Sequence, residues 1–180
     1  MYTPPTSVPA TPLATRREIF AWAMFDFANS GYTTVVLTAI FNVYFVGVIA
    51  GVHDSGTATF LWTLAITATN ILVLMSAPVL GAIADHGAHK KRFLLASTVG
   101  CVLFTLLLGT LGEGDILPAM ALVILASSMF GTGENLIAAF LPEIARQQDM
   151  GRISGYGWAL GFLGGLLVLG VCLIYITWAR

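Results

Sequence analysis

The chain has 180 residues, of which 57% are hydrophobic and only 9% are charged, whereas about a quarter of the residues in an average soluble domain are charged. This composition excludes an ordinary soluble globular protein. The formal net charge of −1 excludes the basic surface that nucleic-acid binding requires. Both cysteines, Cys101 and Cys172, lie in apolar runs, so the sequence predicts neither a disulfide framework nor a CxxC metal or redox site.

The first 15 residues contain four prolines and no charge. A segment of this composition buries too little apolar surface to fold, so we predict a disordered cytoplasmic tail over residues 1–18. A secretory signal is not expected, because Arg16 and Arg17 come late and the apolar stretch that follows them is too long.

Five long stretches without Asp, Glu, Lys or Arg follow the tail. A helix needs about 20 apolar residues to cross a hydrocarbon core of about 30 Å. The sequence therefore predicts an all-α, polytopic membrane protein with five membrane-spanning helices. The predicted spans cover about residues 20–49, 58–84, 93–112, 117–141 and 153–178.

The basic residues are expected almost entirely on one side of this bundle. The tail and the second and fourth connections carry seven of the eight, namely Arg16, Arg17, Lys90, Lys91, Arg92, Arg146 and Arg152. The positive-inside rule places that side, together with the N-terminus, in the cytoplasm. Because the loops are short and no targeting segment is found, we expect a bacterial inner membrane, with a vacuolar or other endomembrane as the alternative.

Two spans carry polar residues on one face. At 100° per residue, one arc of about 140° on the first span contains Asp26, Asn29, Ser30, Thr33 and Thr34. Thr38 and Asn42 leave this arc, which indicates either a cavity in the cytoplasmic half or a bent helix. The fourth span aligns Ser127, Gly131, Glu134 and Asn135.

Asp26 and Glu134 are expected at similar depths in the membrane, because Glu134 lies about 12 Å inside Glu143 at 1.5 Å per residue. An ionisable group there costs at least about 2.5 kcal/mol and is usually functional or paired. If the two carboxylates are neighbours, their repulsion would poise one of them to carry a proton. Two structural explanations stay open: Asp26 as an interfacial acid favoured by the helix dipole, and Glu134 as a hydrogen-bond partner between helices.

Hydroxyl and small residues mark two further helix faces. We interpret the stripe on the second span as packing, since threonine often bonds the carbonyl four residues earlier; it consists of Thr59, Thr63, Thr67 and Asn70. On the fifth span, glycines recur every four residues at Gly157, Gly161 and Gly165, with Gly155, Gly164 and Gly170 beside them. This repeat predicts a face on which another helix packs closely.

The second connection, residues 81–92, reads GAIADHGAHKKR and is short and strongly basic. With an acid at the end of the preceding helix, such a loop can make charge contacts that lock one arrangement of helices and release another. The three basic residues at its end would also be explained by chain orientation alone. Both interpretations are open.

Three segments resemble the major facilitator superfamily of secondary transporters, and within it the group of autophagy-related vacuolar amino-acid effluxers and their bacterial relatives. Residues 22–32, WAMFDFANSGY, are similar to that group's opening signature W-x-x-x-D-[FW]-A-N-S-x-Y. Residues 81–92 are similar to the superfamily's loop motif G-x-x-x-D-R-x-G-R-[KR], and residues 140–144, 151–154 and 158–165 resemble the group's fourth-to-fifth-helix segment. His86, Ala88 and His89 depart from the loop motif, and the two histidines would make its charge sensitive to pH.

The resemblance implies the N-terminal portion of a twelve-helix transporter, without the sixth helix of its own bundle and without the second bundle that alternating access requires. The intact protein would export a small solute such as amino acids, coupled to protons, and would need no cofactor. Its other partners would be the lipid bilayer and the missing C-terminal half or a complementing chain. The substrate and proton pathway would comprise Asp26, Asn29, Ser30, Tyr32, Thr33, Glu134 and Asn135. The cytoplasmic gate would comprise Gly81, Asp85, His86, His89, Lys90, Lys91 and Arg92.

The alternative is a non-transporting five-helix membrane protein, which either acts only by association through its glycine face or has no function. An enzyme is not expected, because the sequence has no metal-spaced histidine cluster, no G-x-S-x-G elbow and no phosphate loop. No metal site is predicted.

Overall fold

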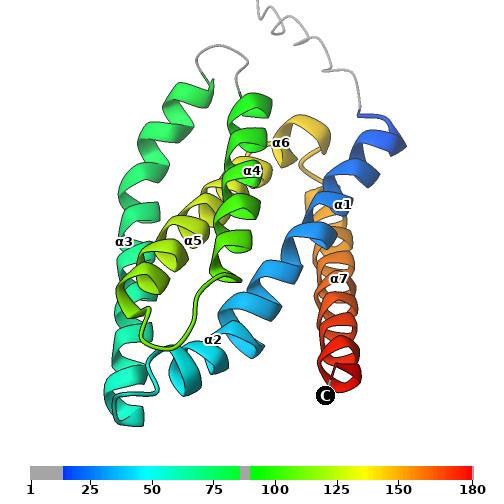
Figure 1. Ribbon diagram of the computed structural model, residues 1–180. Coiled ribbons are helices and arrows are strands. Elements are labelled where there is room, and N and C mark those ends of the chain that lie inside the picture. Colours follow the sequence, from blue (N-terminus) through cyan, green and yellow to red (C-terminus); the bar gives the residue numbers. More distant parts are fainter. Residues whose placement is uncertain (1–13, 86–89, 180) are drawn as a thin grey trace, which may run out of the picture.

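Figure 1 shows the computed structural model of the chain, which describes residues 14–85 and 90–179. Every regular element in this part of the chain is a helix. The α-helices are α1 (Arg16–Tyr32), α2 (Phe41–Tyr44), α3 (Ser55–Asp85), α4 (Lys90–Leu108), α5 (Ile116–Ala138), α6 (Leu141–Ile144) and α7 (Met150–Trp178). Two π-helical segments, η1 (Thr33–Ala39) and η2 (Phe45–Ile49), extend the first membrane span beyond α1.

Within the described residues, five helical stretches are long and apolar enough to cross a membrane, which confirms the predicted all-α polytopic fold. They are Arg16–Ile49, Ser55–Ala82, Lys90–Leu108, Ile116–Ile144 and Met150–Trp178. Each corresponds to one predicted span, and the ends differ by a few residues. Most side chains on these stretches are at least partly exposed, as expected of helices that contact lipid.

The first span begins at Arg16, inside the stretch that the sequence analysis assigned to the tail. The cause is a capping box: the Thr15 hydroxyl accepts a hydrogen bond from the Glu18 amide at 3.3 Å, and the Glu18 carboxylate accepts one from the Thr15 amide at 2.7 Å. These bonds satisfy backbone donors at the helix start. The Thr-x-x-Glu pattern at residues 15–18 was the available sequence signal. Residues 1–13 of the predicted tail lie outside the described residues.

The first span is not a regular α-helix beyond Tyr32. In the π-helical segments the backbone bonds run from residue i to residue i−5, as from the Ile40 amide to the Val35 carbonyl at 2.9 Å and from the Ala50 amide to the Phe45 carbonyl at 2.8 Å. Each π turn adds a residue to the α-helical repeat and rotates everything that follows. The position of Thr38 around the helix therefore does not follow from a constant 100° per residue, and the Thr38 hydroxyl bonds the Thr33 carbonyl five residues earlier.

The spans form two packed groups (Figure 1). Helix α1 runs along α7, while α3 and α4 both pack against α5. Helices α1, α4 and α7 begin at the same end of the bundle at which α3 and α5 end. This end carries Arg16, Lys90 and Arg152, and we call it the basic end.

Helix α3 begins after Asp54, which lies in the connection between the first two spans. The Asp54 carboxylate accepts hydrogen bonds from the Thr57 amide at 2.9 Å and the Thr57 hydroxyl at 2.7 Å. These bonds favour the charged form and lower the pKa of Asp54 below its ordinary value. Further along α3, the Thr59 and Thr63 hydroxyls bond the carbonyls four residues earlier, as expected of threonine in a helix. All four residues of this stripe are exposed, so within the described residues the stripe does not pack against another helix.

The glycine strip of α7 lies against α1. A Cβ atom added at Gly157 would lie 2.6 Å from the Trp22 ring, and one added at Gly165 would lie 2.5 Å from the Thr34 hydroxyl. At Gly164 an added Cβ would overlap the backbone carbonyl of Phe27. The strip is thus occupied within the chain, which disfavours its use for association between chains.

A cluster of buried side chains holds η2 against α3 and α5, toward the end opposite the basic end. Phe45 and Ile49 of η2 are fully buried, and so is Val123 of α5. The rings of Phe45 and Trp62 pack with their centroids 5.4 Å apart. Cys101 is buried in the same cluster, as expected of a thiol that acts as a small hydrophobic group.

Candidate functional site

A recess of about 420 Å³ lies between α1, α5 and α7 and contains both of the membrane carboxylates. Its lining residues are Asp26, Ser30, Thr33, Thr34, Phe130, Glu134, Trp158, Gly161, Phe162 and Leu166. We call it the carboxylate recess. Asp26 and Glu134 come from helices more than 100 residues apart in sequence, so only the packing of α1 beside α5 and α7 brings them to one cavity.

Glu134 is partly buried and is held by a neighbour on α1. The Asn29 side-chain amide donates a hydrogen bond to its Oε1 atom over 2.5 Å. A donor at this position stabilises a carboxylate in surroundings where few other donors are present. The hydrogen bond from Asn29 thus links α1 to α5 and holds the Glu134 carboxylate at the edge of the carboxylate recess.

Because Gly161 has no side chain, α7 leaves room for the Asp26 and Ser30 side chains of α1. A Cβ atom at position 161 would lie 2.8 Å from the Asp26 Oδ2 atom and 2.7 Å from the Ser30 hydroxyl oxygen. Any side chain there would press on both polar groups, so the close approach of α7 to α1 and the shape of the recess depend on the same glycine.

The other described lining residues are aromatic, hydroxyl-bearing or aliphatic, and none of them carries a positive charge. Phe130, Trp158 and Phe162 supply aromatic side chains, and none of the lining residues is Lys or Arg. Sequence reasoning missed the two aromatic residues of α7, Trp158 and Phe162, because aromatic residues on an apolar span resemble lipid-facing side chains. In the structure they are 80% and 69% exposed. Their position beside the glycine strip was the signal that could have placed them near α1.

Tyr32 lies outside the carboxylate recess. It is buried, its hydroxyl group shares a hydrogen bond of 2.8 Å with the Ser127 hydroxyl, and its ring stacks on Phe130 with the centroids 5.1 Å apart. Both the ring and the hydroxyl group of Tyr32 therefore contribute to the packing of α1 on α5. Its place in the predicted pathway is at most indirect, behind Phe130.

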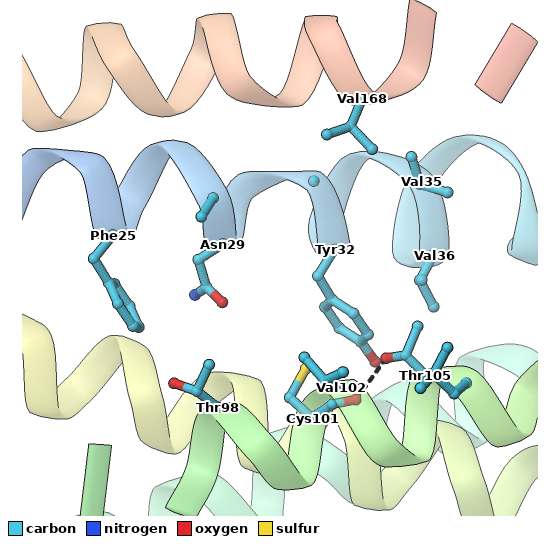
Figure 2. A pocket seen from close by; sticks show the side chains of 13 residues that line it. Phe25, Asn29, Tyr32, Val35, Val36, Thr98, Cys101, Val102, Thr105 and Val168 are labelled. Atoms are coloured by element: carbon cyan, nitrogen blue, oxygen red, sulfur yellow. Dashed lines mark hydrogen bonds between the residues drawn. The ribbon is translucent and has the colours of Figure 1, made fainter. Parts of the chain in front are cut away.

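Tyr32 and Asn29 instead line a second, largely apolar recess of about 410 Å³, shown in Figure 2. In that view Phe25, Asn29 and Tyr32 of α1 face Thr98, Cys101 and Thr105 of α4, and Val168 of α7 lies on the far side of α1. The Thr105 hydroxyl in this recess bonds the carbonyl of Cys101 on its own helix at 2.7 Å. Asn29 is thus placed between the apolar recess and the carboxylate of Glu134.

Asn135 lies apart from Glu134 although the sequence pattern grouped them. It lines a small recess of about 100 Å³ together with Gly81 of α3 and Lys90 of α4. Neighbouring residues on a helix point about 100° apart. The side of α5 that faces α1 therefore holds Glu134, and the side that faces α3 and α4 holds Asn135.

The predicted gate segment is described only in part. His86 and His89 lie outside the described residues, as does the side chain of Asp85, while Lys91 and Arg92 are exposed. The Lys90 ammonium group forms an ion pair of 2.7 Å with the Glu143 carboxylate of α6. Sequence reasoning missed Glu143 as a partner, although both residues were assigned to connections on the same side of the membrane.

We expect the Lys90–Glu143 pair to contribute less than about 1 kcal/mol, because the Glu143 side chain is half exposed and solvent screens the interaction. Lys90→Gln, Glu143→Gln and the double variant form a double-mutant cycle whose coupling is read from thermal unfolding in detergent. The coupling should shrink at high salt. Arg92→Gln is the control on the same helix. A coupling of several kcal/mol would show that the pair is a strong latch between α4 and α6.

Trp22 was noted only as a motif residue, and the structure gives it a contact. Its indole nitrogen donates a hydrogen bond of 2.9 Å to the backbone carbonyl of Ile137 in the last turn of α5. The same carbonyl also accepts a hydrogen bond of 3.2 Å from the Phe140 amide. Trp22 therefore ties α1 to the end of α5, one turn beyond Glu134.

The fold and the carboxylate recess define a multi-pass helical membrane protein in which two acids line one recess between the helices. A profile of the family described as "Vacuole effluxer Atg22 like" matches residues 42–180, and the chain belongs to this family. This agrees with the resemblance found in the sequence.

Two curated relatives extend the match. The chain is 27% identical over 165 residues to the uncharacterized MFS-type transporter YxiO of Bacillus subtilis. The aligned segment covers 89% of this chain and 38% of the relative. The chain is also 27% identical over 118 residues to autophagy-related protein 22 of Coccidioides immitis. This alignment covers 65% of the chain and 18% of the relative. The chain thus spans well under half the length of these relatives. No solved structure gives a significant match.

Proposed function

We propose that this chain is the N-terminal part of a major-facilitator secondary transporter that exports a small solute, such as an amino acid, in exchange with or together with protons. The single observation that carries the proposal is the carboxylate recess, which is lined by Asp26 of α1, Glu134 of α5 and Gly161 of α7. Family membership and the relationship to an MFS-type transporter support it.

Glu134 is our candidate for the proton carrier. It is only partly buried and lines an open recess, so a proton can reach it, and its hydrogen bond from Asn29 is one that the charged form accepts well. Protonation would weaken this bond and release α1 from α5 at that level. Such coupling between a proton and a helix contact is what a proton-driven change of conformation requires.

The second bundle, or a complementing chain, would supply the remaining wall of the recess. Trp158 and Phe162 are largely exposed here and would face that wall together with the substrate. We further propose that the basic end faces the cytoplasm, where the segment from Gly81 to Arg92 would gate access. A bacterial inner membrane is the proposed location.

The proposal is tested by Glu134→Gln in the complete protein, reconstituted in vesicles with a pH gradient. Solute flux driven by the gradient should fall at least about ten-fold, because an amide cannot carry the proton. Flux between equal solute pools without a pH gradient should be affected less. Glu113→Gln, which changes an exposed acid in a connection, is the control. Gradient-driven flux that equals that of the wild type would remove the proton role from Glu134.

A further inference from the structure

A recess at the basic end lies between the first turns of α1 and α7. It has a volume of about 500 Å³, and its lining residues are Arg16, Ile19, Asp149, Arg152, Ile153 and Tyr156. None of these residues lines the carboxylate recess or the apolar recess. The mechanism proposed above does not use them.

Arg152 is held in place by its own helix. Its Nε–H group donates a hydrogen bond of 2.8 Å to the Tyr156 hydroxyl, and its guanidinium carbon lies 5.6 Å from the centroid of the Tyr156 ring. This bond uses Nε alone, so the donors on the two terminal nitrogens remain for another acceptor. In the part of the chain that the structure describes, no carboxylate forms an ion pair with Arg152.

The recess combines positive charge with apolar side chains. Arg16 and Arg152 contribute two positive charges, and Asp149 is the one acid among the lining residues. The first turns of α1 and α7 also direct their positive dipole ends toward this region. Ile19 and Ile153 provide apolar surface beside these charges, and Ile153 is buried.

The position of the recess separates it from a solute path. Tyr156 and Trp158 are two residues apart on α7, so their side chains point about 160° apart, and Trp158 lines the carboxylate recess. Arg16 and Arg152 also lie where two apolar spans begin, which is the level of lipid headgroups. Basic recesses between helices at this level are suited to phosphate groups of anionic lipids.

We propose that this recess binds the headgroup phosphate of an anionic phospholipid, with Arg152 and Arg16 as its ligands and with Ile19 and Ile153 against the start of the acyl chains. Tyr156 acts as a positioning residue, because it holds the Arg152 guanidinium at the recess. Binding would join α1 to α7 at the basic end.

The test is native mass spectrometry of the complete protein in detergent with added phosphatidylglycerol, phosphatidylcholine or inorganic phosphate. Phosphatidylglycerol should be retained in preference to phosphatidylcholine, which carries the same phosphate beside a positive charge. Arg152→Gln and Arg16→Gln should each weaken its retention roughly five-fold, the effect expected for one basic side chain near an anionic surface. Arg146→Gln is the matched control, since Arg146 is exposed nearby and does not line the recess.

Equal retention of the two lipids, or an Arg152→Gln protein that binds phosphatidylglycerol like the wild type, would overturn the proposal. Displacement of the lipid by millimolar inorganic phosphate would identify free phosphate as the ligand and would also overturn it. Arg16→Gln keeps the test decisive if Arg152→Gln does not fold, because the two arginines lie on different helices. The readout does not depend on transport, so it is independent of the proposed function.

Discussion

Replacing Gly164 by alanine is expected to destabilise the protein by about 3 kcal/mol, the upper end of the usual cost of overpacking. The added Cβ would overlap the backbone carbonyl of Phe27, which cannot move without displacing α1. Helix α7 would have to shift away along the whole glycine strip. The measurement is the thermal unfolding of the purified protein in detergent, followed by circular dichroism.

Gly170→Ala is the matched control on the same helix, because a Cβ at Gly170 would meet nothing within 4 Å. There the substitution should be neutral or should stabilise the helix by up to about 1 kcal/mol, since alanine has the higher helix propensity. Equal unfolding temperatures for the two variants would show that α1 and α7 do not pack as closely as the structure has them.

Phe45→Ala is expected to cost about 3–5 kcal/mol, the range for removal of a fully buried aromatic side chain. Phe45 is fully buried, and its ring packs on Trp62 of α3. The substitution would leave a cavity where η2 meets α3, at a π-helical segment whose own backbone repeat is rarely adopted. Thermal unfolding in detergent and the loss of near-ultraviolet circular dichroism from Trp62 would report the change.

Phe60→Ala provides the comparison, because Phe60 lies on α3 two residues before Trp62 and is 63% exposed. In a detergent micelle its removal should cost less than about 1 kcal/mol, as for surface positions that leave no cavity. A similar loss for both variants would mean that η2 does not form the centre of this cluster.

The number and position of the membrane spans followed from the sequence because the bilayer imposes a simple length requirement. Long stretches without charge correspond to the five apolar helical stretches, since backbone polar groups in lipid must be bonded within a helix. The glycines at 157, 161 and 165 were similarly informative, because a glycine repeat at helical spacing has few uses except close packing. The partner helix, α1, could not be known from the repeat.

The arrangement of the candidate site depended on the tertiary structure. The sequence placed Asp26 and Glu134 at similar depth, but only the packing of α1, α5 and α7 brought them to one recess and gave Glu134 its bond from Asn29. In the same packing Tyr32 bonds Ser127, and Asn135 lines a separate recess together with Lys90.

Helical periodicity specifies the direction in which a side chain points around the helix axis, and it does so only while the helix stays regular. The π-helical segments η1 and η2 change that repeat in the first span, where Phe45 and Ile49 of η2 lie in the buried cluster. The sequence by itself thus determined which segments enter the membrane and which residues are costly there, because burial in lipid depends on composition. Which of those residues meet was decided by contacts between helices that are distant in sequence.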